Sequence, residues 1–112
     1  MPKENIYFSE SKLLDKLNVV APQLREYLAR KLSGSSKKLT PSEISIRFVK
    51  VNGGKMMARV ELEITAYALP ERVKREDKIC REVAEFLNKR IPAAKEFQVW
   101  LKLCELGHSW QT

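Results

Sequence analysis

Three consecutive segments of the sequence predict a strand, a helix and a second strand: MARVELEITAY (57–67), PERVKREDKICREVAEFLNKRI (70–91) and KEFQVWLKLCEL (95–106). The first alternates apolar and polar residues with the period of a half-buried strand. The second repeats its apolar residues with the period of an amphipathic helix. A proline opens the helical segment and Pro92 stops it, as proline does at the two ends of helices. The sequence therefore predicts a β-α-β unit.

The first half of the chain repeats the end of this unit. The matching pairs are EYLARKL (26–32) with EFLNKRI (85–91), and EISIRFVKV (43–51) with EFQVWLKL (96–103). A single β-α-β unit cannot bury its apolar faces alone, whereas two copies that share one sheet can. We therefore predict a duplicated unit.

The predicted fold class is α+β, with the order β-α-β-β-α-β and a four-stranded sheet that carries two helices on one face. One domain is expected over 1–112, which is long enough to bury a core without disulfides or metal. Its first unit spans about 5–51, its second spans about 57–106, and a C-terminal tail covers 107–112.

The chain is basic, with 21 lysines and arginines against 14 acidic residues and a formal net charge of +7. Such a charge favours a small anionic substrate or nucleic acid as the partner. The basic residues are spread along the chain without an RNA-binding motif, so nucleic acid is not the expected partner. No apolar run could span a bilayer and no signal segment begins the chain, which predicts a cytoplasmic protein without membrane contact.

Cys80 and Cys104 form no CxxC motif and no cluster with histidine, so no metal site is predicted. The sequence also lacks the glycine-rich and nucleophile motifs that bind cofactors or carry out acyl transfer. We therefore expect neither a metal nor a cofactor.

The first unit is expected to begin with a short strand at 5–8. Pro22 interrupts the helical pattern that follows, which predicts a brief turn and then a main helix at about 21–32. A strand is expected at 44–51. Asn-Gly-Gly at 52–54 is typical of a tight hairpin turn, and it predicts that this strand pairs with the next one.

Alternation in the third strand predicts two different faces. The residues expected to face the helices are Val60, Leu62, Ile64 and Ala66, and those expected to face away are Arg59, Glu61, Glu63 and Thr65. The buried stripe of the second helix is predicted to contain Val73, Cys80, Val83, Ala84, Leu87 and Ile91. Arg47 on the preceding strand is expected to pair with Glu61 or Glu63.

Two β-α-β units and a proline directly after the initiator methionine resemble the tautomerase superfamily. The segments that carry the resemblance are Met1-Pro2, ISIRFVKV (44–51), MARVELEIT (57–65) and VWLKL (99–103). Within the superfamily the chain is similar to the 5-carboxymethyl-2-hydroxymuconate isomerase and macrophage migration inhibitory factor groups and to small uncharacterised bacterial relatives. This resemblance implies a homotrimer with a central channel and with sites between neighbouring subunits.

The resemblance also implies that Pro2, freed when Met1 is removed, is the catalytic base. A secondary amine in an apolar pocket loses proton affinity, because burial disfavours its charged form. It can then take a proton from a carbon beside a carbonyl and return the proton elsewhere. If Met1 is retained, the nitrogen of Pro2 is an amide and cannot act as a base.

Substrate-binding residues are implied at four further positions. Arg47 lies on the strand where the isomerase group has two alternating arginines, although Ser45 occupies the position of the other. Trp100 matches an aromatic residue of the last strand, Lys102 stands where the inhibitory-factor group has an amide, and Lys38 adjoins the position of a site lysine.

The leading hypothesis is an isomerase that catalyses keto–enol tautomerisation of a small 2-oxo or 2-hydroxy unsaturated acid. One alternative is a catalytically silent protein of the same fold that acts in binding or assembly. The other is a ferredoxin-like basic domain that binds nucleic acid, because that fold shares the same order of strands and helices.

Overall fold

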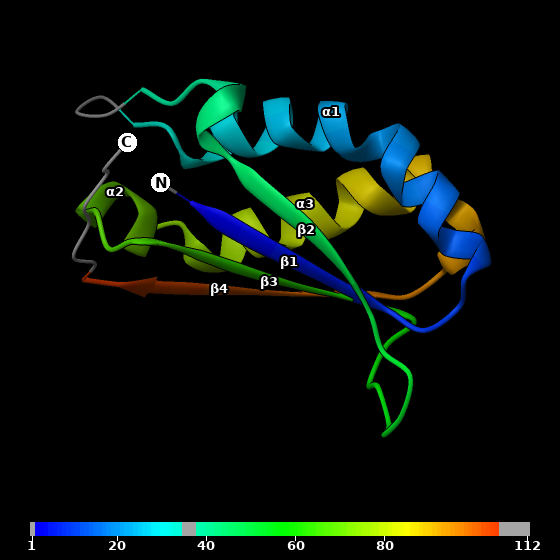
Figure 1. The fold of residues 1–112 in the computed structure, drawn as a ribbon. Helices are drawn as coiled ribbons and strands as arrows, with labels where there is room; N and C mark the ends of the chain where they lie inside the picture. Colours follow the sequence, from blue (N-terminus) through cyan, green and yellow to red (C-terminus); the bar gives the residue numbers. More distant parts are fainter. Residues whose placement is uncertain (1, 35–37, 106–112) are drawn as a thin grey trace, which may run out of the picture.

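The computed structural model describes residues 2–34 and 38–105, and its elements follow the predicted order (Figure 1). The strands are β1 (Lys3–Phe8), β2 (Ser45–Lys50), β3 (Val60–Tyr67) and β4 (Phe97–Cys104). The helices are α1 (Lys12–Leu32), α2 (Pro70–Val73) and α3 (Glu76–Arg90), with single 3₁₀ turns η1 (Pro41–Glu43) and η2 (Pro92–Ala94). Met1 and the predicted tail at 107–112 lie outside the described residues. None of the helices described here has the length and apolar content needed to cross a bilayer.

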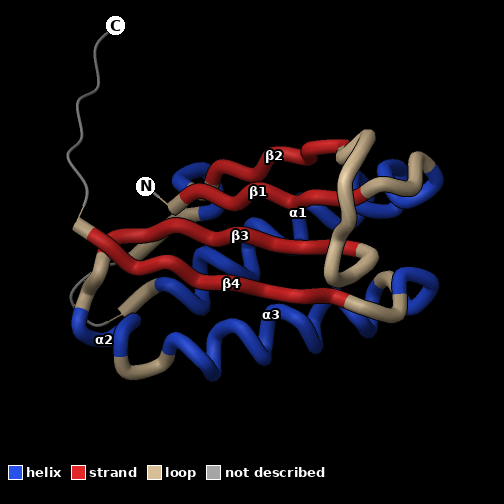
Figure 2. Tube along the Cα trace, turned by 90° about the horizontal axis from the view of Figure 1, so that it is seen from below, coloured by secondary structure: helices blue, strands red, loops and turns tan. Residues whose placement is uncertain are grey.

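The four strands form one sheet in the order β2-β1-β3-β4. β1 runs parallel to β2 and antiparallel to β3, and β3 runs parallel to β4. Figure 2 shows this order, with the long helices α1 and α3 behind the sheet and the opposite face open. The predicted α+β class, with helices on one face of a four-stranded sheet, is confirmed.

The predicted hairpin between the second and third strands is wrong. β1 lies between β2 and β3, and the loop that carries Asn52 and Gly53 crosses from one side of β1 to the other (Figure 2). Both edges of β1 are thereby paired, and β2 obtains its partner from its own unit. In a ferredoxin-like split unit another strand would separate β1 from β2, so the ferredoxin-like alternative is also wrong.

Two boundaries in the first unit differ from the prediction. β1 begins at Lys3, directly after Pro2, because pairing with both β2 and β3 extends it beyond the apolar residues. α1 is one helix that continues through Pro22, and Figure 1 shows its two halves running in different directions. A buried stripe from Leu13 to Leu32 packs both halves on the sheet, which offsets the hydrogen bond that proline removes.

The second helical segment is divided into α2 and α3. Val73 is 47% exposed, so its predicted place in the buried stripe is wrong, and Arg72 is buried instead. Because the helix breaks between α2 and α3, the side chains of α2 do not continue the buried stripe of α3. The guanidinium of Arg72 donates hydrogen bonds to the carbonyls of Leu32 and Tyr67, each 2.9 Å long, which satisfies its buried charge.

Equivalent residues of the two units meet in the core. Tyr27 of α1 and Phe86 of α3 stack with ring centroids 4.2 Å apart, and their neighbours Leu28 and Leu87 are fully buried. The inward-facing residues of β3 are all buried, as predicted. The core therefore lies between the helices and one face of the sheet, and no helix of the described chain covers the other face.

Candidate active site

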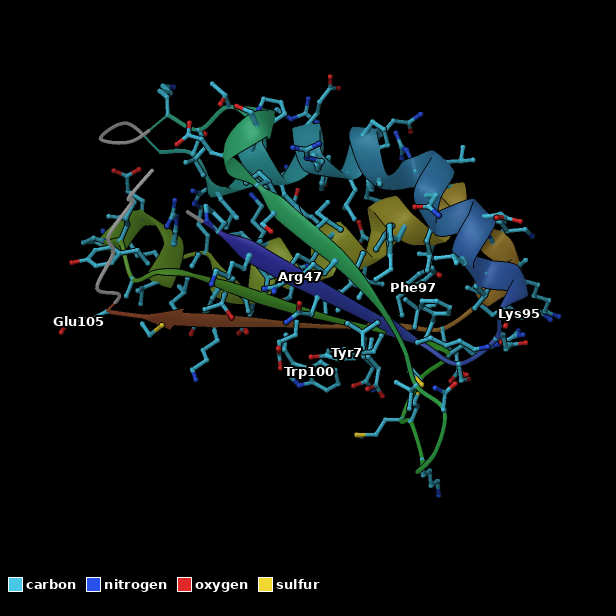
Figure 3. All side chains as sticks on the ribbon, viewed as in Figure 1. Tyr7, Arg47, Lys95, Phe97, Trp100 and Glu105 are labelled. Atoms are coloured by element: carbon cyan, nitrogen blue, oxygen red, sulfur yellow. The ribbon has the colours of Figure 1, made fainter. Side chains whose placement is uncertain are left out.

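The open face of the sheet carries three of the predicted binding residues. Arg47 lies beside Asn5, Asn5 beside Glu63, and Glu63 beside Trp100, so one row of side chains crosses all four strands. Arg47 is exposed, and Trp100 is 45% exposed. Figure 3 shows Trp100 and Tyr7 projecting from this face, away from the helices.

The neighbouring row contains the third residue, Lys102. In it Ser45 pairs with Lys3, Lys3 with Thr65, and Thr65 with Lys102. Lys3 and Lys102 are both exposed, and sequence reasoning missed Lys3 because the first strand was expected to begin two residues later. Together with Arg47 in the adjacent row, these amines make this half of the open face positive, which suits a carboxylate ligand.

The expected ion pair between Arg47 and a glutamate of β3 is wrong. β1 separates the two strands, and among the described residues Arg47 takes part in no ion pair. Glu63 instead accepts hydrogen bonds from the amide of Asn5 at 3.3 Å and from the hydroxyl of Tyr7 at 3.4 Å. The guanidinium of Arg47 is thus available to a ligand.

Pro2 lies at the start of β1 on the opposite side of the sheet. Its side chain is buried, Lys3 is exposed, and Glu4 is buried again, so alternation places Pro2 and Glu4 together on the helix side. The amide of Ser45 donates a 3.1 Å hydrogen bond to the carbonyl of Pro2. Within one chain, therefore, the predicted base does not share a face with Arg47 and Lys102.

Lys38 is exposed in the loop between α1 and η1. This loop leads into the start of β2, and it lies at the same end of the molecule as the N-terminus (Figure 1). Lys38 therefore does not lie in the rows of the open face that hold Arg47, Trp100 and Lys102.

Glu4 is a buried carboxyl that sequence reasoning missed. It is fully buried, and neither carboxyl oxygen has a hydrogen-bond partner in the part of the chain that the structure describes. Its neighbours in the sheet are Ile46 and Ile64. Burial raises the pKa of Glu4 from 4.5 to about 8, because the apolar surroundings disfavour the charged form. If β1 is taken to begin at residue 3, the alternation of side chains predicts that Glu4 faces the core together with Ile6 and Phe8.

A cavity of about 470 Å³ lies at the other end of the sheet, between the loop that joins β2 to β3 and the turn that joins β1 to α1. Arg59 at its edge binds Glu10 with two hydrogen bonds of 2.8 and 2.7 Å and also reaches the carbonyl of Ala93. This pairing lowers the pKa of Glu10, mainly through its hydrogen bond to Arg59. The cavity is separate from the predicted site residues, and its arginine already has partners.

The arrangement of strands and helices defines the class of fold, and solved structures show the same arrangement. A macrophage migration inhibitory factor-like protein from Entamoeba histolytica aligns with 99% of this chain and 94% of its own, with a TM-score of 0.66 and 14% identity. A fused 4-OT described as an asymmetric trimer aligns with 98% of this chain over 94% of its own length, with a TM-score of 0.70 and 10% identity. The chain therefore has the tautomerase fold, as its sequence predicted.

A third similar structure is N1, a member of the cis-3-chloroacrylic acid dehalogenase family, with a TM-score of 0.58 and 10% identity over 93% of this chain and 74% of that protein. No protein-family model matches the sequence, and no curated protein matches it significantly. At these identities the likeness concerns the fold, and the reaction has to be argued from the residues.

Burial of Glu4 should make stability depend on pH in a chain that keeps Met1, for instance one with a short N-terminal extension. Between pH 4.5 and about 8 the folded chain holds a proton that the unfolded chain releases. Stability therefore falls as pH rises through this window, by at most about 1.4 kcal/mol per pH unit, and the loss levels off above it. Glu4→Gln should remove this slope in denaturant unfolding at fixed protein concentration.

The matched control is Glu85→Gln, because Glu85 is exposed on α3 and the substitution makes the same chemical change. It should retain the slope of the parent chain. An unchanged slope in Glu4→Gln would show that Glu4 does not carry the proton.

Proposed function

We propose that this protein is a tautomerase that interconverts the keto and enol forms of a small 2-oxo or 2-hydroxy unsaturated acid. The observation that carries the proposal is the position of Pro2. It directly precedes a central strand of a tautomerase fold and is buried there. Removal of Met1 would turn its nitrogen into a secondary amine in an apolar setting, which is the chemistry of a general base.

The open face supplies the second part of the proposed reaction. Arg47 and Lys102 hold the substrate carboxylate and stabilise the negative charge that develops on the enol oxygen. Trp100 covers the apolar part of the substrate, and Lys38 adds a positive charge at the edge of the site. The proton removed by Pro2 is then returned to a different carbon, so the reaction needs no cofactor.

The separation of Pro2 from these side chains within one chain supports a site that forms between chains. In a homotrimer, the open face of one copy would approach the N-terminal end of another. The similarity to a protein described as a trimer supports this assembly. Each site would then combine the Pro2 of one chain with the arginine, lysine and tryptophan of its neighbour.

Light scattering should therefore give three times the 13.0 kDa mass of the chain. Trp100→Glu should dissociate the assembly, because an interface disfavours burial of an unpaired charge. Val19→Glu is the control, since Val19 is 74% exposed on α1, far from the open face, and this change should leave the mass unaltered. A wild-type chain that remains a monomer contradicts the shared site.

The base is tested by intact mass and enolisation. Protein without Met1 should enolise a phenylpyruvate-type substrate, and Pro2→Ala should reduce kcat/KM by about 100-fold or more, the usual contribution of a general base. A chain with an N-terminal extension should be inactive while keeping its circular dichroism spectrum. If native protein retains Met1, or if the extended chain is equally active, the proline mechanism is wrong and a silent binding protein becomes the better description.

The anion-binding role is tested with Arg47→Ala. Because the guanidinium has no ion-pair partner among the described residues, stability should change by no more than about 0.5 kcal/mol. Loss of a charged hydrogen bond to the substrate should raise KM by roughly 10-fold or more. Arg81→Ala, on the exposed side of α3, is the control and should leave KM unchanged. A wild-type KM in Arg47→Ala would remove Arg47 from the site.

A further inference from the structure

The proposed reaction does not use the buried carboxyl of Glu4. It lies two residues after Pro2 and on the same side of β1. Two strand steps separate the Cα atoms by roughly 6.6 Å, which a glutamate side chain can span. Neither of its oxygens has a hydrogen-bond partner among the described residues. The nitrogen of Pro2 is therefore within reach of a carboxyl that lacks a partner.

The fold itself does not require an acid at this position. In the first unit Glu4 pairs with Ile46, and in the second unit Leu62 pairs with Val99. The internal repeat aligns Ile46 with Val99, so Leu62 is the counterpart of Glu4. Leu62 is fully buried, which shows that an apolar side chain fits this place in the sheet. A carboxyl here lowers stability and indicates a functional requirement.

Among the described residues, no charged group forms an ion pair with Glu4. Arg72 of α2 is the other buried charged residue described, and it donates to the carbonyls of Leu32 and Tyr67. The charges that influence the pKa of Arg72 are Arg75 and Glu71 rather than Glu4.

Other charged residues among those described at this end also leave the pKa of Glu4 unaffected. They include Lys38 and Glu43 in the segment before β2, Glu105 directly after β4, and Lys3 and Lys102 on the opposite face of the sheet. None of them contributes to the pKa of Glu4, for which burial is the cause of the shift.

We propose that Glu4 is a positioning residue whose carboxyl binds the free imino nitrogen of Pro2 and shares a proton with it. The proposal rests on the proposed function in one respect, the removal of Met1. The pair carries one proton at neutral pH, either as a prolinium–carboxylate ion pair or as a neutral amine beside a neutral acid. The two groups then titrate as a unit rather than separately.

This pairing defines what happens to the proton during the reaction. In the form of the pair that has lost its shared proton, the amine of Pro2 takes the proton from the substrate carbon, and the electrons of the C–H bond move into the enolate. The new N–H of the prolinium donates to the carboxylate of Glu4, which also holds the ring in one orientation. The prolinium then returns the proton to carbon, so that both groups regain their starting state and no other reactant is needed.

The test is a titration of the Pro2 nitrogen by ¹⁵N NMR in protein that lacks Met1. Glu4→Gln keeps the size of the side chain and removes its charge. It should lower the pKa of Pro2 by about one to three units, the effect of an opposite charge at close range. The rising limb of the pH–kcat profile should move to lower pH by the same amount. Glu85→Gln, exposed on α3, should leave both unchanged.

If the Pro2 titration in Glu4→Gln matches that of the wild type, the inference is wrong even where enolisation continues. If the titration moves as expected but neither protein enolises any 2-oxo acid, the pairing is correct and the proposed reaction is wrong. Should Glu4→Gln fail to fold, Glu4→Asp provides the second variant. Its shorter carboxyl should also lower the pKa of Pro2, and an unchanged value would overturn the pairing.

Discussion

The antiparallel pairing of β1 with β3 is the interaction on which the rest of the structure depends. Each of these strands belongs to one β-α-β unit, and their shared edge joins the two units into a single sheet. The same pairing brings α1 and α3 together over one face, where Tyr27 stacks on Phe86. Because β1 is paired on both edges, its register is fixed, and the register decides whether each side chain faces the helices or the open face.

This register gives β1 two chemical roles. Its inward residues enter the core, except that Glu4 and Pro2 introduce polar chemistry at the end nearest the N-terminus. Its outward residues join the rows that contain Arg47, Trp100 and Lys102. A one-residue shift in register would exchange the two sets, so the strand pairing controls the position of both the proposed base and the proposed anion-binding group.

Glu4 shows how a functional requirement can oppose the requirements of folding. Leu62 occupies the equivalent place in the second unit and only fills space. A carboxyl there must remain neutral or find a cation, because an unpaired charge in an apolar environment is strongly unfavourable. A free amine at Pro2 would supply that cation, and the stability of the N-terminal end of the sheet would then depend on removal of Met1.

Much of the fold could be predicted from local patterns. Alternation in 57–67 identified the inward residues of β3, and the repeat identified Leu28 and Leu87 as equivalent core positions. The predictions failed where distant segments compete for the same partner. Asn52 and Gly53 are typical of a hairpin, but β2 pairs with β1, and sequence alone does not show which strand edge is free.

The candidate site was predicted less completely, for the same reason. The resemblance to a family identified Pro2, Arg47, Trp100, Lys102 and Lys38, and the structure places three of them on one face. Lys3 and Glu4 were missed because their exposure depends on where β1 begins, and pairing with β2 and β3 determines that boundary. Arg47 was expected to pair with a glutamate because the strand between them was not foreseen.

The sequence by itself determined the two β-α-β units, their apolar faces and the proline behind the first methionine, because period and composition are local properties. Only the tertiary structure decided the strand order, the open face shared by Arg47 and Trp100, and the isolation of Glu4 beside Pro2. Those features depend on which segments meet across the sheet. The two units associate because each buries its apolar face against the other, and the pattern of a single segment does not show which partner it will meet.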